Sequence, residues 1–350
     1  MTTFSINQAA LADLSPSEEM VLAALCYGDI FDFALTVAEI ATYAPFLHCQ
    51  PEELATVADA LVARGKIGKR NGYLFLSGRD ALAEKRRKKV DLVAEKWTLI
   101  HHHLPPLVAL SFVKGILLTG SLAAKNPTPK ADADLLLILD HRRMWIGYLA
   151  IRLWLRRQKH IEFCPNYAIS DRSLALVYPN LFTAIELSIA VPLKYGPAVE
   201  ELESVNGWWR ELIPNGPRLA EKRVDIPARS TLLTTAISLL VASPLGWLLD
   251  RLEYGRLRWR TRGHYLPNRS VYKPHPPTRQ YRIFKAFQTR LDREGLAVPA
   301  IRAHLAKEFP ILEQAMNAWG IDPANLPEQR QRGPRAVASA KDGVMAEQVS

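Results

Sequence analysis

Cysteine is scarce in this sequence, and the three that occur, Cys26, Cys49 and Cys164, lie far apart and are odd in number. This excludes a disulfide framework and a zinc site built on closely spaced cysteines, and it is typical of a reducing compartment. The segment 1–12 also lacks a basic region followed by a long apolar run, so we expect no signal peptide. These absences together predict a cytoplasmic protein.

A long hydrophobic run is also missing, with one partial exception. The segment 230–249 carries no charged residue between Arg229 and Asp250, and its length is near the minimum for a membrane span. However, it contains threonines, serines, Pro244 and Gly246 instead of strong hydrophobes throughout. This composition favours a buried helix or a helix at a membrane surface over a true span.

What the chain does have is positive charge. Its 350 residues are enough for two or three domains, and the net charge is +10. Such a balance favours polyanionic partners, namely nucleotides, nucleic acid or an anionic membrane face. The excess gathers at 85–89 and again among the arginines of 251–262. Each cluster is either a solvated helix face or a binding surface.

The first part of the chain predicts three short helices followed by a hairpin. Capping boxes at 15–18 and 36–39 open the first two helices, and a third runs from Pro51 to Gly65. The pair Asn71-Gly72 is the strongest short hairpin motif, and apolar residues flank it. Three helices and a two-stranded hairpin describe a winged helix.

This winged-helix-like module, assigned to residues 1–79, has little of what DNA binding needs. Its third helix begins with Glu52 and Glu53 and contains Asp59. Phosphate contacts need Lys and Arg where such a helix meets the duplex. Basic residues in the predicted wing are few: Lys66, Lys69 and Arg70. We therefore expect an interaction or scaffolding module; nucleic acid stays a possible but not a favoured partner.

A long polar helix is predicted from Asp80 to about Ile100, with its apolar residues near one stripe. The run 101–103 consists of three histidines, which invites a metal-site interpretation. Consecutive residues on a helix point in different directions, however, so three neighbours are poor common ligands. The histidines are more consistent with a helix end.

The residues that carry chemistry follow this helix. A strand at 113–119 runs into Gly120-Ser121, and a second strand opens with Asp132-Ala133-Asp134 before an apolar run. Side chains alternate along a strand, so Asp132 and Asp134 project from one face and Ala133 from the other. Two neighbouring carboxylates suit Mg²⁺, and a glycine lets the backbone approach a phosphate closely.

This segment resembles the GS…DxD motif of the DNA polymerase β nucleotidyltransferase superfamily. The resemblance implies an enzyme that transfers a nucleoside monophosphate from a nucleoside triphosphate, with release of pyrophosphate. It implies that Gly120 and Ser121 hold the triphosphate and that Asp132 and Asp134 bind Mg²⁺ or Mn²⁺, in a two-metal mechanism. The alternative from the residues alone is an ordinary turn with solvent-exposed aspartates.

The superfamily usually supplies a third carboxylate from a later strand. Asp140 lies about 20 Å beyond Asp134 along an extended strand, so the two cannot share an ion. The next strand is expected at 160–164, after a crossover helix at 144–157. There Glu162 alternates with apolar neighbours, which makes it the best candidate for a catalytic residue and third metal ligand, although aspartate is commoner in the superfamily.

The arrangement also resembles uncharacterised prokaryotic nucleotidyltransferase-domain proteins with a winged-helix-like N-terminal region. The residues that carry this likeness are 29–33 (DIFDF), 119–123 (TGSLA) and 164–167 (CPNY). It extends from about residue 15 to about residue 200 and does not identify the acceptor. Asn166 and Tyr167 are equally consistent with lining the nucleotide pocket and with a turn at the end of the strand.

The sequence therefore predicts an α+β or α/β fold with four parts. After the N-terminal module come a nucleotidyltransferase core at 80–200, a helical region at 201–328 and a disordered tail at 329–350. The predicted function is Mg²⁺-dependent nucleotidyl transfer to an unknown acceptor. The alternative is a regulatory protein that binds a nucleotide through the same fold without turnover. Contact with a membrane surface through 230–249 stays open.

Overall fold

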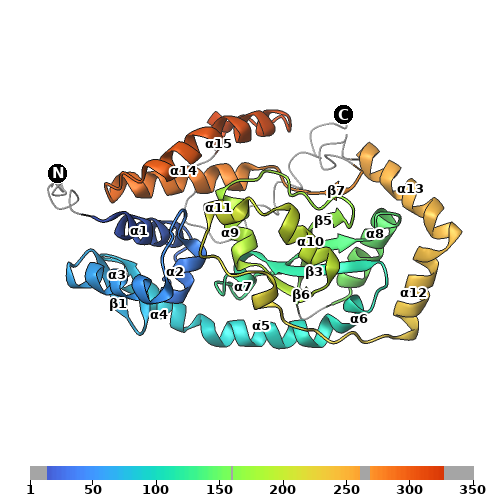
Figure 1. The fold of residues 1–350 in the computed structure, drawn as a ribbon. Coiled ribbons are helices and arrows are strands. Elements are labelled where there is room, and N and C mark those ends of the chain that lie inside the picture. Colours follow the sequence, from blue (N-terminus) through green and yellow to red (C-terminus); the bar gives the residue numbers. More distant parts are fainter. Residues whose placement is uncertain (1–13, 159–160, 261–268, 327–350) are drawn as a thin grey trace, which may run out of the picture.

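The computed structural model describes residues 14–158, 161–260 and 269–326 and has an α+β fold (Figure 1). The expectations for 1–12 and for the tail at 329–350 lie outside these residues. Helices surround a five-stranded mixed sheet, and a separate two-stranded sheet lies near the N-terminus. The predicted fold class is confirmed at this level.

The N-terminal module has the predicted elements. Its helices are α1 (Pro16–Asp29), α2 (Val37–Tyr43) and α3 (Pro51–Ala63), and its hairpin is β1 (Ile67–Arg70) with β2 (Tyr73–Leu76). Both predicted capping boxes are present, at Ser15 and at Thr36. Asn71 and Gly72 form the hairpin turn with φ of 53° and 78°, the left-handed region that this turn requires. Leu35 also pairs with Leu74 outside the named strands.

The predicted long helix is broken in two. Helix α4 (Ala81–Arg87) is followed by Lys88, which caps it, and α5 (Lys89–His103) then continues to the histidine run. The histidines therefore stand at a helix end, as expected. A short helix α6 (Pro105–Val108) then leads to the sheet. Figure 1 shows α5 running along the lower edge of the molecule, from the N-terminal module towards α6.

The central sheet has the strand order β6-β3-β4-β5-β7. Its members are β3 (Val113–Thr119), β4 (Ala133–Leu139), β5 (Phe163–Ser170), β6 (Val191–Lys194) and β7 (Val271–Tyr272). Only β4 and β5 are parallel, and α8 (Met144–Leu155) is the crossover between them. Short α7 (Gly120–Ala123) begins where β3 ends.

The alternation of side chains along β4 separates two cores. Ala133, Leu135 and Leu137 pack with α8, whereas Leu136 and Ile138 pack with α9 (Leu181–Ile189) and α14 (Thr278–Arg293). Period-two alternation therefore assigns Asp134 to the α9 and α14 face. The second core also includes α1, so the predicted N-terminal, central and C-terminal parts share one hydrophobic cluster.

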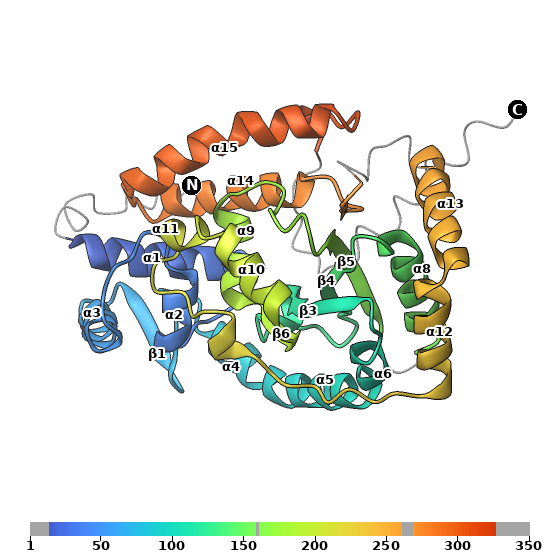
Figure 2. The same ribbon diagram turned by 45° about the vertical axis from the view of Figure 1, so that its right-hand side comes forward.

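The remaining elements are helical. They are α10 (Pro197–Val205), α11 (Trp209–Leu212), η2 (Ala220–Lys222), α12 (Leu232–Ala242), α13 (Pro244–Arg260), α15 (Pro299–Asn317) and η3 (Pro323–Asn325). In Figures 1 and 2, α14 and α15 lie together along one edge, and α12 and α13 lie beyond α8 on another. No single helix among the described residues meets the length and apolarity of a membrane span; α12 and α13, bent by 78°, meet them only as a pair.

Candidate functional site

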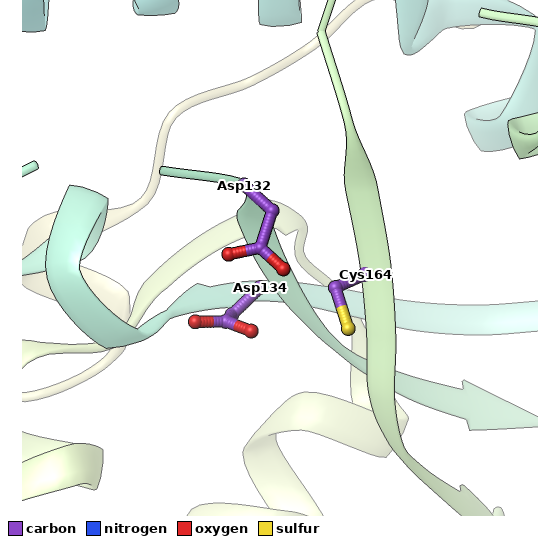
Figure 3. Close-up of side chains that lie close together, drawn as sticks. All are labelled: Asp132, Asp134 and Cys164. Carbon is purple, nitrogen blue, oxygen red and sulfur yellow. The ribbon is translucent and has the colours of Figure 1, made fainter. Parts of the chain in front are cut away.

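Two aspartates and a cysteine come together at the start of β4 (Figure 3). Asp132 directly precedes β4, Asp134 is its second residue, and Cys164 is the second residue of β5. One potential ligand atom from each lies within 4.8 Å of those from the other two, and all three side chains are half-buried. The expected closeness of Asp132 and Asp134 is therefore present, and Ala133 between them is buried on the other face.

Gly120 lies directly against Asp134. Thr119 pairs with Asp134 across β3 and β4, and the next residue, Gly120, turns the chain with φ of +67°. A Cβ atom on Gly120 would lie 2.2 Å from Oδ2 of Asp134, well inside van der Waals contact. Glycine is therefore needed at this position for two reasons, its backbone conformation and the space that the carboxylate occupies.

Asp134 lies in an environment that opposes its negative charge. Burial raises the pKa of its carboxyl to about 7, and repulsion from Asp132 and Glu186 adds to the effect. Arg279 and a hydrogen bond from Asn166 Nδ2, 2.8 Å from Asp134 Oδ1, act in the opposite direction. Two close carboxylates, with the pKa of Asp134 raised, form a site that a bound cation would stabilise.

The structure does not bring Glu162 into this group, which corrects its predicted position. Strand β5 begins at Phe163, the residue after Glu162, and its second residue, Cys164, pairs with Asp134. Neighbours in register project from the same face, so Cys164 has the place beside Asp134 that was expected for a carboxylate. The side chain of Glu162 is exposed.

A register shift in β5 places Asn166 beside Asp134. Between the pairs Asp134–Cys164 and Leu136–Tyr167, β5 contains one residue more than β4. Such a bulge redirects a side chain, and here the Asn166 amide donates to the Asp134 carboxylate. The strand continues to Ser170, so the interpretation of Asn166 and Tyr167 as a strand-end turn is wrong.

A further carboxylate, Glu186, comes from α9 and was not identified from the sequence. Its Oε2 accepts a hydrogen bond of 3.3 Å from the backbone N–H of Gly120. Burial raises the pKa of Glu186, whereas Arg279, the Gly120 N–H and Lys273 lower it. Glu186 therefore holds the Gly120 turn from the side of α9.

Two basic residues from the C-terminal region interact electrostatically with these carboxylates. Arg279 is exposed in the first turn of α14, and it acts electrostatically on both Asp134 and Glu186. Lys273 follows β7, and its Nζ lies 4.8 Å from the ring centroid of Tyr178. Burial lowers the pKa of Lys273 to about 8, and Glu186 counteracts the shift. Nothing in the sequence near either residue marks it as part of the site.

The connection between Ser121 and Asp132 is held by the helices that precede the sheet. Lys96, a buried residue of α5, donates to the carbonyl oxygen of Ala131 at 2.6 Å. Arg86 donates to the carbonyl oxygen of Lys125 at 2.6 Å, and Lys89 contacts the side chain of Asn126. Ser121 itself is half-buried at the start of α7. These anchors fix both ends of the connection that presents Asp132.

The chain was compared with protein-family models, curated proteins and solved structures. No family model matches it, and no curated protein or solved structure matches it significantly. The function is therefore inferred from the geometry of the site.

Proposed function

We propose that this protein is a divalent-metal-dependent nucleotidyltransferase of the polymerase β type. It would transfer a nucleoside monophosphate from a nucleoside triphosphate to an acceptor that the site does not identify. The observation that carries this proposal is the arrangement of two adjacent aspartates packed against a glycine turn at the end of the neighbouring strand. The same arrangement underlies the resemblance of the sequence to that superfamily.

The residues present fit a divalent cation. The ligand atoms of Asp132 and Asp134 are within 4.8 Å of each other. Burial and, after it, repulsion from Asp132 raise the pKa of Asp134, and a cation between the two carboxylates relieves that repulsion. Carboxylate oxygens suit Mg²⁺ or Mn²⁺, and such an ion supplies charge stabilisation to the reacting phosphates. Burial beside the aspartates raises the pKa of the Cys164 thiol to about 12. Mg²⁺ prefers oxygen ligands to sulfur, so we assign the ion to the two carboxylates.

The surrounding residues support the binding of a triphosphate. Gly120 is buried beside Asp134 with its N–H bonded to Glu186, and the half-buried Ser121 follows with a hydroxyl and a backbone N–H. Lys273 and Arg279 provide positive charge opposite the carboxylates. Asn166 orients one oxygen of Asp134 and leaves the other, Oδ2, on the side of Gly120. We assign phosphate binding to the two basic residues and metal binding to Asp132 and Asp134.

A second function, nucleotide binding without turnover, is favoured by one observation. The β5 side chains beside Asp134 are Cys164 and Asn166, and neither is a carboxylate. The superfamily mechanism uses a third carboxylate near this position. A site that holds one cation between two carboxylates retains a nucleotide more readily than it completes a two-metal reaction.

The N-terminal module has the order of a winged helix, and we propose that it serves as a scaffold. Exposed side chains of α3 include Glu52, Glu53 and Asp59, and Asp59 pairs with the wing residue Lys69 at 2.8 Å. This leaves a face of α3 that repels phosphates. A salt-dependent, submicromolar affinity of the full chain for duplex DNA would contradict this assignment.

The two functions are separated by measuring binding and turnover on the same preparation. Titration calorimetry with each nucleoside triphosphate and Mg²⁺ reports binding, and pyrophosphate release in the presence of cell extract reports transfer. Transfer predicts that both occur and that both decline in Asp134→Asn. Binding without pyrophosphate in any extract supports the second function, and the absence of Mg²⁺-dependent binding contradicts both.

A further inference from the structure

The outer surface of α12 and α13 concentrates the exposed hydrophobic side chains of the molecule. Among the described residues, nine of the thirteen large hydrophobic side chains that are exposed belong to these two helices. The nine are Leu232, Leu233, Leu239, Leu240, Leu245, Trp247, Leu248, Leu252 and Trp259. An exposed apolar surface of this extent indicates a contact with another apolar partner.

Helix α13 buries charged side chains and exposes apolar ones, the reverse of an ordinary surface helix. The stripe that faces the protein includes Asp250 and Glu253, both buried, whereas the opposite stripe carries Leu245, Leu252 and Trp259. Asp250 accepts hydrogen bonds from the first backbone N–H groups of α8, at 2.8 and 3.1 Å. Asp250 thus attaches the helix to α8, Glu253 pairs with Arg256 of the same helix at 2.6 Å, and apolar side chains face outwards. This corrects the interpretation of 230–249 as a buried helix.

The charge on this surface has one sign. From residue 226 to residue 260 the only carboxylates are the two buried ones. Five arginines in the same stretch are exposed: Arg229, Arg251, Arg256, Arg258 and Arg260. The guanidinium of Arg251 lies 4.0 Å from the ring centroid of Trp247. Tryptophan and arginine beside an apolar face are typical of helices that lie in a membrane interface.

The lengths of the helices exclude a span by either one. Helix α12 has 11 residues and α13 has 17, which correspond to about 16 Å and about 25 Å. Both are shorter than the hydrocarbon core of a bilayer, about 30 Å. The two helices meet at an angle of 78°, and in Figures 1 and 2 they form the outer edge of the molecule beyond α8.

We propose that α12 and α13 dock this protein on the surface of an anionic lipid bilayer. The leucines and tryptophans enter the interface, and the arginines contact lipid phosphates and bury their aliphatic stems. A second copy of the chain is a poorer occupant. A twofold contact places the same surface on both sides, so it would bring arginines against arginines. The two carboxylates of this stretch are already bonded to α8 and to Arg256. An anionic headgroup layer supplies the missing negative charge.

The test is flotation of the full chain with lipid vesicles. Vesicles of phosphatidylcholine and phosphatidylglycerol are compared with vesicles of phosphatidylcholine alone. We expect binding to the anionic vesicles that weakens as salt is added. The triple variant Leu239→Gln/Leu248→Gln/Leu252→Gln should lower the partition coefficient at least tenfold. Arg258→Gln and Arg260→Gln should each lower it about fivefold on anionic vesicles.

Matched controls come from exposed residues elsewhere on the protein. Val205 and Ile311, each 50% exposed on other helices, are changed together to glutamine, and Arg70 is changed to glutamine in the hairpin. These controls should leave flotation unchanged, and circular dichroism should show all variants folded. No flotation of the wild-type chain with anionic vesicles overturns the proposal. So does self-association in sedimentation velocity that the triple variant abolishes, or flotation that the triple variant does not reduce.

Discussion

Gly120 leaves the space that the carboxylate of Asp134 fills, since a Cβ atom at Gly120 would lie 2.2 Å from Oδ2 of Asp134. The two residues come from the ends of adjacent antiparallel strands, and Glu186 holds the backbone N–H of the glycine from a third element. The turn and the carboxylate that we propose as a metal ligand are therefore one unit. A change in either one moves the other.

The first prediction concerns Gly120→Ala. The added methyl group must displace the Asp134 carboxylate, so we expect Mg²⁺-dependent nucleotide binding to weaken at least tenfold, about 1.4 kcal/mol. The matched control is Gly65→Ala, because Gly65 has φ of +66° and no atom within 4 Å of an added Cβ. Both variants should lose about 1 kcal/mol of stability from backbone strain. Equal nucleotide binding by both variants would contradict the proposed role of the turn.

The second prediction follows from the raised pKa of Asp134. Its carboxyl titrates at about 7 in the folded protein and at an ordinary value of 3.8 when unfolded. Between pH 3.8 and pH 7 the folded state binds more protons than the unfolded state. The contribution of this carboxyl to the free energy of unfolding is therefore fully present below pH 3.8 and is lost as the pH rises through 7. In thermal melts without divalent metal, the stability of Asp134→Asn should therefore fall less than that of the wild type as the pH rises to 7. Added Mg²⁺ should stabilise the wild type more at pH 8 than at pH 6, because the carboxylate binds metal deprotonated.

The third prediction concerns Lys273. If its ammonium binds phosphate, Lys273→Met should weaken the binding of a nucleoside triphosphate at least tenfold and that of the nucleoside little. Lys285→Met is the control, since Lys285 also lies over a tyrosine ring, that of Tyr281 on α14. Calorimetry that finds the same loss in both variants, or a loss for nucleoside as large as for triphosphate, would contradict the assignment.

The fourth prediction concerns Asp29, which links the N-terminal module to the C-terminal helices. This buried carboxylate pairs with Arg79 at 2.5 Å and with Arg290 of α14 at 2.8 Å. Asp29→Asn leaves two arginines without their shared partner, so we expect a loss of about 3 kcal/mol in the free energy of unfolding. Asp32, which is 41% exposed and also pairs with Arg79, serves as control. Asp32→Asn should cost less than about 1 kcal/mol by denaturant melts.

Local sequence patterns predicted much of the fold and the centre of the site. The capping residues Ser15 and Thr36, the Asn71-Gly72 turn and the strand at 113–119 are all where they were expected. These features depend on neighbours within a few residues. The closeness of Asp132 and Asp134 follows from the same strand periodicity.

The rest of the site depends on tertiary packing. Glu186, Lys273 and Arg279 reach it because α9 and α14 cover the face of the sheet that carries Asp134. No local pattern marks them. The position of Glu162 was misjudged because a pattern of alternation does not fix where a strand starts, and β5 begins only at Phe163. The sequence also did not decide whether α12 is buried or exposed. An uncharged apolar helix can pack inside a protein or lie on its surface, and its composition is the same in both cases.

The most direct test of the central claim is the labelling of acceptors in cell extract by nucleoside triphosphates labelled at the α-phosphate. The account predicts Mg²⁺-dependent labelling by the wild type and its loss, by at least a hundredfold, in Asp132→Asn and Asp134→Asn. Glu162→Gln should label as the wild type does, because the exposed Glu162 lies outside the aspartate group. Labelling that persists in Asp134→Asn, or that no triphosphate supports with the wild type, would contradict the claim that these aspartates form a nucleotidyl-transfer site.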